Sequence, residues 1–134
     1  MVRQYRPAMN VYTLEFPAGE IHKNETPIQA VKREVLEELG IHSIFLPLGN
    51  YSLMMNRTNI KNFLFLGLES EKPVRRKAEP GIKRLEIPKF KFQRMVINGE
   101  YLQLAGLGIL QIIRLKYGVD LFRDPLKKVH SLFP

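Results

Sequence analysis

The chain has 134 residues, 45% of them hydrophobic, and a formal net charge of +8. This length fits a single domain, which we expect to span 1–134, and the hydrophobic content argues against wholesale disorder. No apolar run is long enough to span a membrane, and no leader is evident, so we expect no membrane partner. The absence of cysteine excludes disulfides, thiolate metal sites and cysteine nucleophiles, and it is compatible with the cytoplasmic location that we expect.

The basic residues gather in two stretches, 72–77 and 83–94. Such a surface can bind nucleic acid, attract small phosphorylated substrates, or simply be solvated. Aromatic residues interleave with the second stretch only at Phe90 and Phe92. We therefore expect a solvated basic face and disfavour nucleic acid as a partner.

The first predicted elements are two strands, 2–5 and 11–16, rich in strand-forming residues. The turn residues Pro17 and Gly19 follow them. Beyond Gly40 the pattern predicts strands at 43–54, 61–68 and 83–87, helices at 90–97 and 100–117, and a partly loose tail over 118–134. The strand at 61–68 is nearly all apolar, which indicates a central position in a sheet.

The clearest predicted element is a helix that begins after Thr26. Thr26 suits the N-cap, Pro27 suits the first helical position, and Gln29 completes a capping box. Gly40 supplies the C-terminal stop. Apolar residues at steps of three and four define the face that packs on the core. They are Ile28, Val31, Val35 and Leu39.

This helix carries closely spaced carboxylates. From Gly19 to Ile41 the sequence reads Gly-x5-Glu-x7-Arg-Glu-Val-x-Glu-Glu-x-Gly-Ile. Glu34 and Glu38 share one face of the helix, and Glu37 borders it. Like charges at this spacing destabilise a helix unless a counterion is present, and Mg²⁺ prefers oxygen ligands. The alternative is a solvated acidic face.

Three other residues of the same segment admit two interpretations each. Arg33 can orient Glu37 at i+4, or it can form an ordinary surface ion pair. Gly19 either lets the chain turn sharply toward the acidic helix or is a simple turn residue. Glu25 is either a distal member of a metal site or a partner of the helix dipole, and we favour the second.

The pattern fills every fixed position of the signature box of the Nudix hydrolases, and the chain resembles that family. The resemblance implies an α/β Nudix fold with a mixed β-sheet sandwiched between α-helices. It also implies a loop–helix–loop that holds Mg²⁺ (or Mn²⁺) against a diphosphate. Glu34 and Glu38 would bind the metal beside the Ala18 carbonyl, and Glu37 would be a further ligand or help to deprotonate water.

The approach to the box is similar to the ADP-ribose pyrophosphatase branch of this family. The segments that carry this similarity are 2–6 (Val-Arg-Gln-Tyr-Arg) and 14–19 (Leu-Glu-Phe-Pro-Ala-Gly). By this similarity Arg6 contacts a substrate phosphate or ribose, and Glu15 lies near the site. The alternative is a strand arginine and a strand glutamate with solvated ends. The branch also implies a homodimer.

Three features depart from that branch. Further strands normally precede the Arg-Gln-Tyr-Arg segment, so the comparison predicts that N-terminal strands are missing here. Residues 51–57 lack the Ser-Pro-Gly turn that often marks the substrate. The late loop that often supplies the catalytic base offers Glu79, whose cationic neighbours would lower its pKa. A solvated loop glutamate is the alternative for Glu79.

The leading functional hypothesis is Mg²⁺-dependent hydrolysis of a small-molecule nucleotide substrate, a nucleoside diphosphate sugar. ADP-ribose is the first candidate, and it would yield AMP and ribose 5-phosphate. One rival is a Nudix hydrolase acting on a dinucleoside polyphosphate or a damaged nucleotide. Another rival is a non-catalytic domain that binds ADP-ribose-type ligands.

Overall fold

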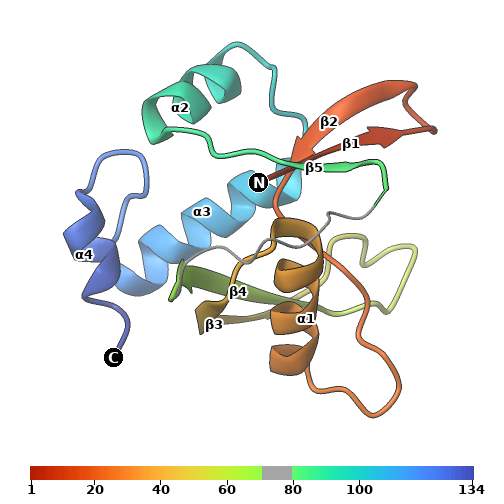
Figure 1. The fold of residues 1–134 in the computed structure, drawn as a ribbon, viewed down its shortest axis with the longest axis horizontal. Helices are drawn as coiled ribbons and strands as arrows, with labels where there is room; N and C mark the ends of the chain where they lie inside the picture. Colours follow the sequence, from red (N-terminus) through yellow and green to blue (C-terminus); the bar gives the residue numbers. More distant parts are fainter. Residues whose placement is uncertain (71–79) are drawn as a thin grey trace.

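The computed structural model describes residues 1–70 and 80–134 (Figure 1). It contains both strands and helices, with α1 between two groups of strands and α2, α3 and α4 after them, so the predicted α/β class is confirmed. The described elements are β1 (Val2–Arg6), β2 (Val11–Glu15), α1 (Pro27–Leu39), β3 (Ser43–Tyr51), β4 (Asn62–Glu69), β5 (Ile82–Arg84), α2 (Lys89–Ile97), α3 (Leu104–Tyr117) and α4 (Leu126–His130).

The described strands form two sheets instead of the single mixed sheet that we expected. One has the order β2-β1-β5 and the other pairs β3 with β4, and all of these pairs are antiparallel. Among the described strands β4 pairs with β3 alone, so the prediction that it is central is wrong. Its apolar composition is explained by packing, because Leu64 and Leu66 lie against the core cluster under α3.

Helix α1 has the ends that the sequence predicts. The Thr26 hydroxyl accepts a hydrogen bond from the Gln29 backbone, and the Gln29 side chain accepts one from the Thr26 backbone at 2.8 Å. Gly40 closes the helix with φ = 65°, a left-handed conformation that glycine adopts readily. The predicted apolar stripe is buried at Val35, whereas Ile28 at its start is exposed.

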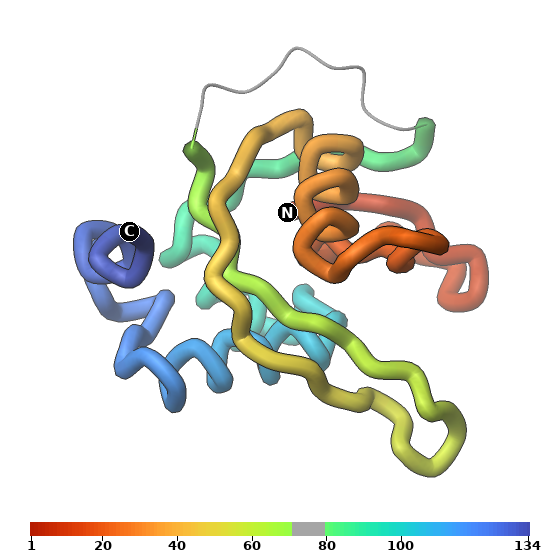
Figure 2. Tube along the Cα trace, turned by 90° about the horizontal axis from the view of Figure 1, so that it is seen from below, coloured from red at the N-terminus to blue at the C-terminus, as the bar shows by residue number. Residues whose placement is uncertain are grey.

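The helices hold the two sheets from different sides. Figure 2 shows β3 and β4 passing between α1 and α3. The Arg84 guanidinium donates to the Leu39 carbonyl at 3.0 Å and so fastens the end of α1 to β5. On the other side, Lys116 donates to the Leu48 carbonyl at 2.7 Å and fastens α3 to β3. These contacts tie α1 to the sheet of β1, β2 and β5, and α3 to the sheet of β3 and β4.

The tail 118–134, expected to be partly loose, is packed in the structure. Val119 and Val129 are buried in one cluster with Leu48 and Ile113. Lys128 donates to the Gly118 carbonyl and to Asp124, both at 2.8 Å, and the ion pair lowers the pKa of Asp124. Pro125 caps the start of α4, where a proline removes no helical hydrogen bond, and burial of the two valines anchors the segment.

The predicted helix over 100–117 begins only at Leu104. The Met95 carbonyl accepts hydrogen bonds from the N–H groups of Glu100 and Tyr101, at 2.8 and 3.3 Å, so the chain turns there. Tyr101 is buried in a second cluster with Leu14 and Phe92, and its burial raises the pKa of its phenol. Within the part of the chain that the structure describes, every helix is too short or too polar to cross a membrane.

Candidate active site

Arg33 organises the acidic side chains of α1. Its Nη1 donates to Glu34 Oε1 at 2.6 Å and to Glu37 Oε2 at 3.1 Å. The i+4 contact to Glu37 is the one that the sequence predicts. The Arg33 side chain is only 24% exposed and its guanidinium contacts several carboxylates. An ordinary surface ion pair, in contrast, joins two exposed side chains. The charge of Arg33 offsets the repulsion among the acids.

Glu25 binds the other edge of the same guanidinium. Arg33 Nε and Nη2 reach the two Glu25 oxygens, each at 3.0 Å, and Nη2 also donates to the Glu20 carbonyl at 2.9 Å. The His22 N–H donates to Glu25 at 2.9 Å. The Arg33 contact, helped by this backbone bond, lowers the pKa of Glu25 to about 2. We expected Glu25 to interact with the helix dipole, whereas in the structure it holds the Arg33 side chain in place.

Gly19 makes room for Glu34. A Cβ atom placed on Gly19 would overlap the Glu34 carboxylate. Gly19 is not among the glycines with positive φ, so its backbone does not need a conformation that only glycine favours. The sharp turn that we expected is thus not what requires glycine here. The requirement is the close approach of the Glu34 carboxylate to Gly19, which the exposed Ala18 precedes directly in the chain.

Glu38 occupies a different environment on the same helix. It is buried, with 6% of its surface exposed, and its charge contributes to a raised pKa of Arg6 on β1. Glu34, in contrast, lies against Gly19 and Arg33. Over residues 1–70 and 80–134, no three acidic or histidine side chains converge closely enough to hold a metal ion as they stand.

The donor chemistry of this helix nevertheless suits a hard divalent cation. Glu34, Glu37 and Glu38 offer carboxylate oxygens within two helical turns, and the missing side chain at Gly19 leaves space at Glu34. The structure brings Glu25, Glu34 and Glu37 together around Arg33. A metal bound by Glu34 would have to share that carboxylate with Arg33 or displace it.

Arg6 and Glu15 form an ion pair across β1 and β2. Arg6 Nε donates to Glu15 Oε1 at 2.8 Å, and Nη2 donates to Oε2 at 2.6 Å. The contact lowers the pKa of Glu15 and raises that of Arg6. The Arg6 side chain is 47% exposed and Glu15 only 11%, so the pair is anchored at the acid and open at the guanidinium. The alternative of two separately solvated strand side chains is therefore wrong, because Arg6 and Glu15 contact each other.

Two neighbours that the sequence analysis missed hold Glu15 in place. The Thr13 hydroxyl donates to Glu15 Oε1 at 2.5 Å, and the Gln4 amide donates to Oε2 at 3.3 Å. Register explains this grouping, because Gln4 lies directly opposite Thr13 in the β1–β2 ladder. Alternation along two strands could have identified these residues, once the pairing was known.

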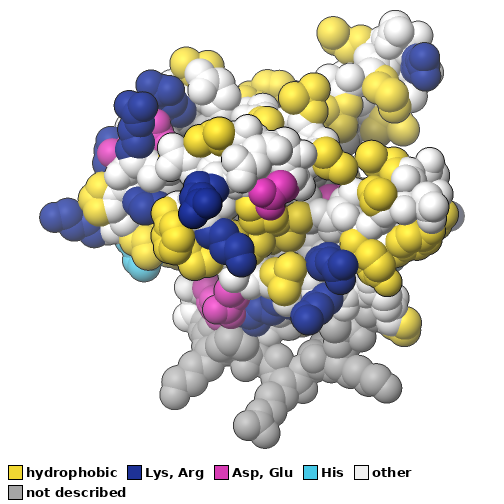
Figure 3. Space-filling model, turned by 90° about the horizontal axis from the view of Figure 1, so that it is seen from above, with side chains coloured by type: hydrophobic (Ala, Val, Ile, Leu, Met, Phe, Trp, Pro, Cys, Tyr) yellow, Lys and Arg dark blue, Asp and Glu magenta, His cyan; other side chains and the backbone are white. Residues whose placement is uncertain are grey.

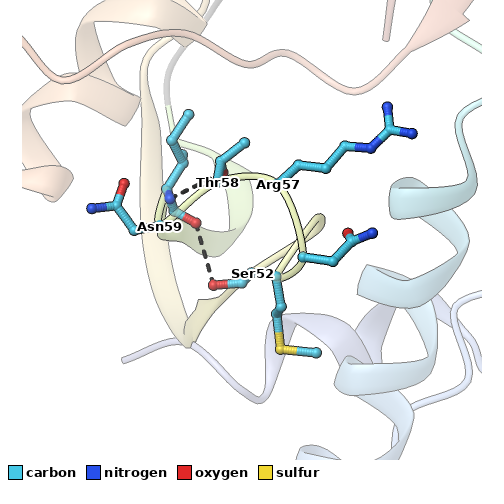
Figure 4. Close-up of a pocket in the computed structure, with 7 residues that line it drawn as sticks. Ser52, Arg57, Thr58 and Asn59 are labelled. Atoms are coloured by element: carbon cyan, nitrogen blue, oxygen red, sulfur yellow. Dashed lines mark hydrogen bonds between the residues drawn. The ribbon is translucent and has the colours of Figure 1, made fainter.

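The two loops that were expected to complete the site contribute differently. Glu79 lies outside the described residues. The β3–β4 loop, which lacks the Ser-Pro-Gly turn, lines an open hollow of about 760 Å³ with Ser52 and residues 55–60 (Figure 4). Ser52 donates to the Ile60 carbonyl at 3.3 Å, and the Ile60 N–H donates to Thr58 at 3.1 Å. These bonds hold the loop closed on itself.

Two curated proteins match short segments of the chain. A 40-residue segment is 52% identical to the ADP-sugar pyrophosphatase of Mus musculus, covering 30% of this chain and 18% of that protein. A 53-residue segment is 42% identical to the 8-oxo-dGTP diphosphatase of Haemophilus influenzae, covering 40% of this chain and 39% of that protein. The matches thus span only about a fifth and two fifths of these relatives.

The two relatives carry different names, so they do not resolve the branch. The family itself is established over a longer stretch, because the model of the NUDIX domain matches residues 1–91. That match contains the box helix, the Arg6–Glu15 strands and both sheets. Members of the family typically depend on a divalent metal. The chain belongs to the Nudix family.

Proposed function

We propose that the protein hydrolyses the diphosphate bond of a nucleoside diphosphate sugar, with ADP-ribose as the first candidate and AMP and ribose 5-phosphate as products. The observation that carries this proposal is the 52% identity to an ADP-sugar pyrophosphatase over 40 residues. The structure supplies support of its own, since an arginine on β1 is held by Glu15 with its guanidinium open to solvent.

The metal-binding role falls to the acids of α1. Glu34 and Glu38, with the Ala18 carbonyl, would hold Mg²⁺ or Mn²⁺, and Glu37 would be a further ligand. When bound, such a cation stabilises charge on phosphoryl oxygens and lowers the pKa of coordinated water. Arg33 keeps Glu37 and Glu34 in place before the metal binds.

The remaining residues bind the substrate and move a proton. Arg6 donates hydrogen bonds to a phosphate from the part of its guanidinium that Glu15 does not engage, since an arginine has five N–H donors and these two bonds use two of them. Glu15 and its partners Thr13 and Gln4 fix the direction of Arg6. Either Glu37 or Glu79 takes the proton of the attacking water.

Two rival functions rest on specific observations. The 42% identity to an 8-oxo-dGTP diphosphatase favours a damaged nucleotide as substrate, and the absence of the Ser-Pro-Gly turn keeps a dinucleoside polyphosphate open as well. The pairing of Glu34 with Arg33 favours a domain that binds ADP-ribose-type ligands without hydrolysing them.

The test is hydrolysis of a nucleotide panel with and without Mg²⁺, accompanied by calorimetric binding of each compound. Turnover of ADP-ribose above the other compounds supports the proposal, whereas turnover of 8-oxo-dGTP or a dinucleoside polyphosphate replaces it with the first rival. Tight ADP-ribose binding without turnover supports the second rival. Light scattering of the same samples tests the homodimer that the branch implies.

A single substitution tests the metal assignment. Glu38→Gln keeps the size of the buried side chain but removes its charge, so Mg²⁺-dependent turnover should fall while the fold is retained. The Glu100→Gln variant, in an exposed loop after α2, is the matched control and should keep full turnover. Unchanged turnover in Glu38→Gln would remove Glu38 from the proposed metal site.

A further inference from the structure

The sheet of β1, β2 and β5 has a second face that the proposed reaction does not use. Successive side chains of a strand point to opposite faces of the sheet. Gln4 and Arg6 of β1 share the face on which they contact Glu15, so Arg3 and Tyr5 lie on the opposite face. Leu14 of β2 lies on this opposite side, where it packs against Phe92 of α2. We call it the α2 face of the sheet.

Two cations lie directly opposite each other on the α2 face. The β1–β5 register pairs Arg3 with Lys83, and partners in an antiparallel ladder project to the same side. Like charges in this position destabilise a sheet. Two acids lie in the same region: Glu86 pairs with Arg84 at 2.6 Å, and Glu100 accepts a hydrogen bond from the neutral Asn98 amide at 3.1 Å and keeps its charge.

Exposed aromatic rings stand beside these cations. Tyr5 and Tyr12 face each other across β1 and β2, with ring centroids 5.4 Å apart, and are 44% and 58% exposed. The Arg3 guanidinium lies 4.0 Å from the centroid of the Tyr12 ring. Planar rings exposed next to cations form a stacking surface, on which a base can lie while its phosphate reaches the cations.

The stacking surface opens into a hollow between the sheet and α2. The hollow has a volume of about 360 Å³, within the usual range of small-molecule sites. Its lining includes Arg3 and Tyr12 from the hairpin, the apolar side chains of Leu14 and Met95, and Lys91 of α2. Glu86 and Glu100 also line it, so a bound phosphate must lie on the side of the cations. Figure 3, which views the molecule from above Figure 1, shows lysine and arginine side chains interspersed with hydrophobic ones on this side.

We propose that the α2 face is a second, non-catalytic binding surface for a nucleotide, either free or within a single strand. A planar base stacks on Tyr12, and its phosphate accepts hydrogen bonds from Arg3, Lys83 and Lys91. The bound phosphate relieves the repulsion between Arg3 and Lys83. The sequence alone disfavours nucleic acid because it shows only Phe90 and Phe92 among the basic residues, whereas the sheet brings two tyrosines to the same cations.

The test is fluorescence anisotropy of the full chain with a labelled oligothymidylate of about eight nucleotides, a length within the usual site size. EDTA is present, so that metal-dependent binding at α1 does not contribute. Tyr12→Leu should weaken binding by about tenfold or more through lost stacking. Lys83→Gln should weaken it and reduce the slope of log K against log salt by about 0.7, which is the value for one phosphate contact of a single strand.

Controls separate this surface from general charge and from the proposed hydrolysis. Lys127→Gln removes an exposed cation from α4 and should leave binding nearly unchanged. Competition with AMP distinguishes the two sources: efficient competition indicates a mononucleotide site, and weak competition indicates a strand. Hydrolysis should be unaffected in Tyr12→Leu. Wild-type affinity in Tyr12→Leu and Lys83→Gln, or an equal loss in Lys127→Gln, would overturn the proposal.

Discussion

The two charged regions on either side of the β2-β1-β5 sheet are built in opposite ways. At α1, a single guanidinium is surrounded by the carboxylates of Glu25, Glu34 and Glu37 and is only 24% exposed. On the α2 face, Arg3 and Lys83 are cross-strand partners of the same sign, next to exposed tyrosine rings. The first region pairs its one cation with acids that contact it, whereas the second places two cations in register with each other.

This difference suits the two regions to different tasks, holding side chains in position at α1 and binding a charged ligand on the α2 face. Groups whose hydrogen bonds are satisfied within the protein are held in fixed rotamers, as a catalytic site requires. Groups of one sign without internal compensation lower the stability of the free protein but gain when an oppositely charged ligand binds. We therefore expect substitutions in the two regions to have effects of different sign on stability and on activity.

The largest effect is expected from Gly19→Ala. The added methyl would occupy the space of the Glu34 carboxylate, which must then move. Displacement of a catalytic group by about 1 Å can cost on the order of a hundredfold in rate, so Mg²⁺-dependent turnover should fall by about that factor. Gly108→Ala is the control, because a Cβ there meets no atom within 4 Å and should leave turnover intact. A Gly19→Ala enzyme as active as the wild type would refute the close-approach argument.

The next largest effect is expected from Arg33→Lys. An ammonium group cannot reproduce the two-pronged contact with Glu25 and also serve Glu34 and Glu37. Loss of such an orienting residue typically lowers metal affinity or activity by about 10- to 100-fold. Mg²⁺ titration of turnover measures it, and Lys32→Gln, an exposed neighbour on α1, should behave as wild type. Because Arg33→Lys keeps the positive charge, wild-type turnover and Mg²⁺ affinity in that variant would refute the need for the guanidinium geometry.

A smaller effect of opposite sign is expected on the α2 face. Lys83→Glu replaces the like-charge pair with Arg3 by an opposite-charge pair, which should stabilise the sheet by about 0.2 to 1 kcal/mol. Urea unfolding measures this change. Lys61→Glu, placed before β4 and exposed, changes the net charge equally and should give less stabilisation. Destabilisation by Lys83→Glu would contradict the cross-strand repulsion.

The smallest and most gradual effect is expected with pH. Arg33 and the His22 N–H lower the pKa of Glu25 from 4.5 to about 2. The folded state therefore binds fewer protons at Glu25 than the unfolded chain does, so this contribution to stability is complete above about pH 4.5 and is lost as the pH falls toward 2. Thermal unfolding from pH 6 to pH 2 should show a weaker decline for Glu25→Gln, and parallel curves for both proteins would exclude the linkage.

Much of the fold followed from local sequence. The capping box, Pro27 and Gly40 placed α1 almost to the residue because each satisfies a backbone requirement within one helical turn. The strands β1, β2 and β5 also lie where the patterns indicate. The division into two sheets and the packed tail were not predicted, because strand pairing and burial depend on contacts between residues far apart in sequence.

For the site, sequence determined which residues carry charge and which share a helix face. The Nudix box identified Glu34, Glu37 and Glu38, and helix periodicity predicted the contact of Arg33 with Glu37. Tertiary structure decided how the charges combine. It brought Glu25 back onto Arg33, Glu15 onto Arg6, and Lys83 beside Arg3. The physical reason is that an ion pair or a repulsion depends on distance, and only the packed loops and strand register set distances between segments that sequence spacing leaves free.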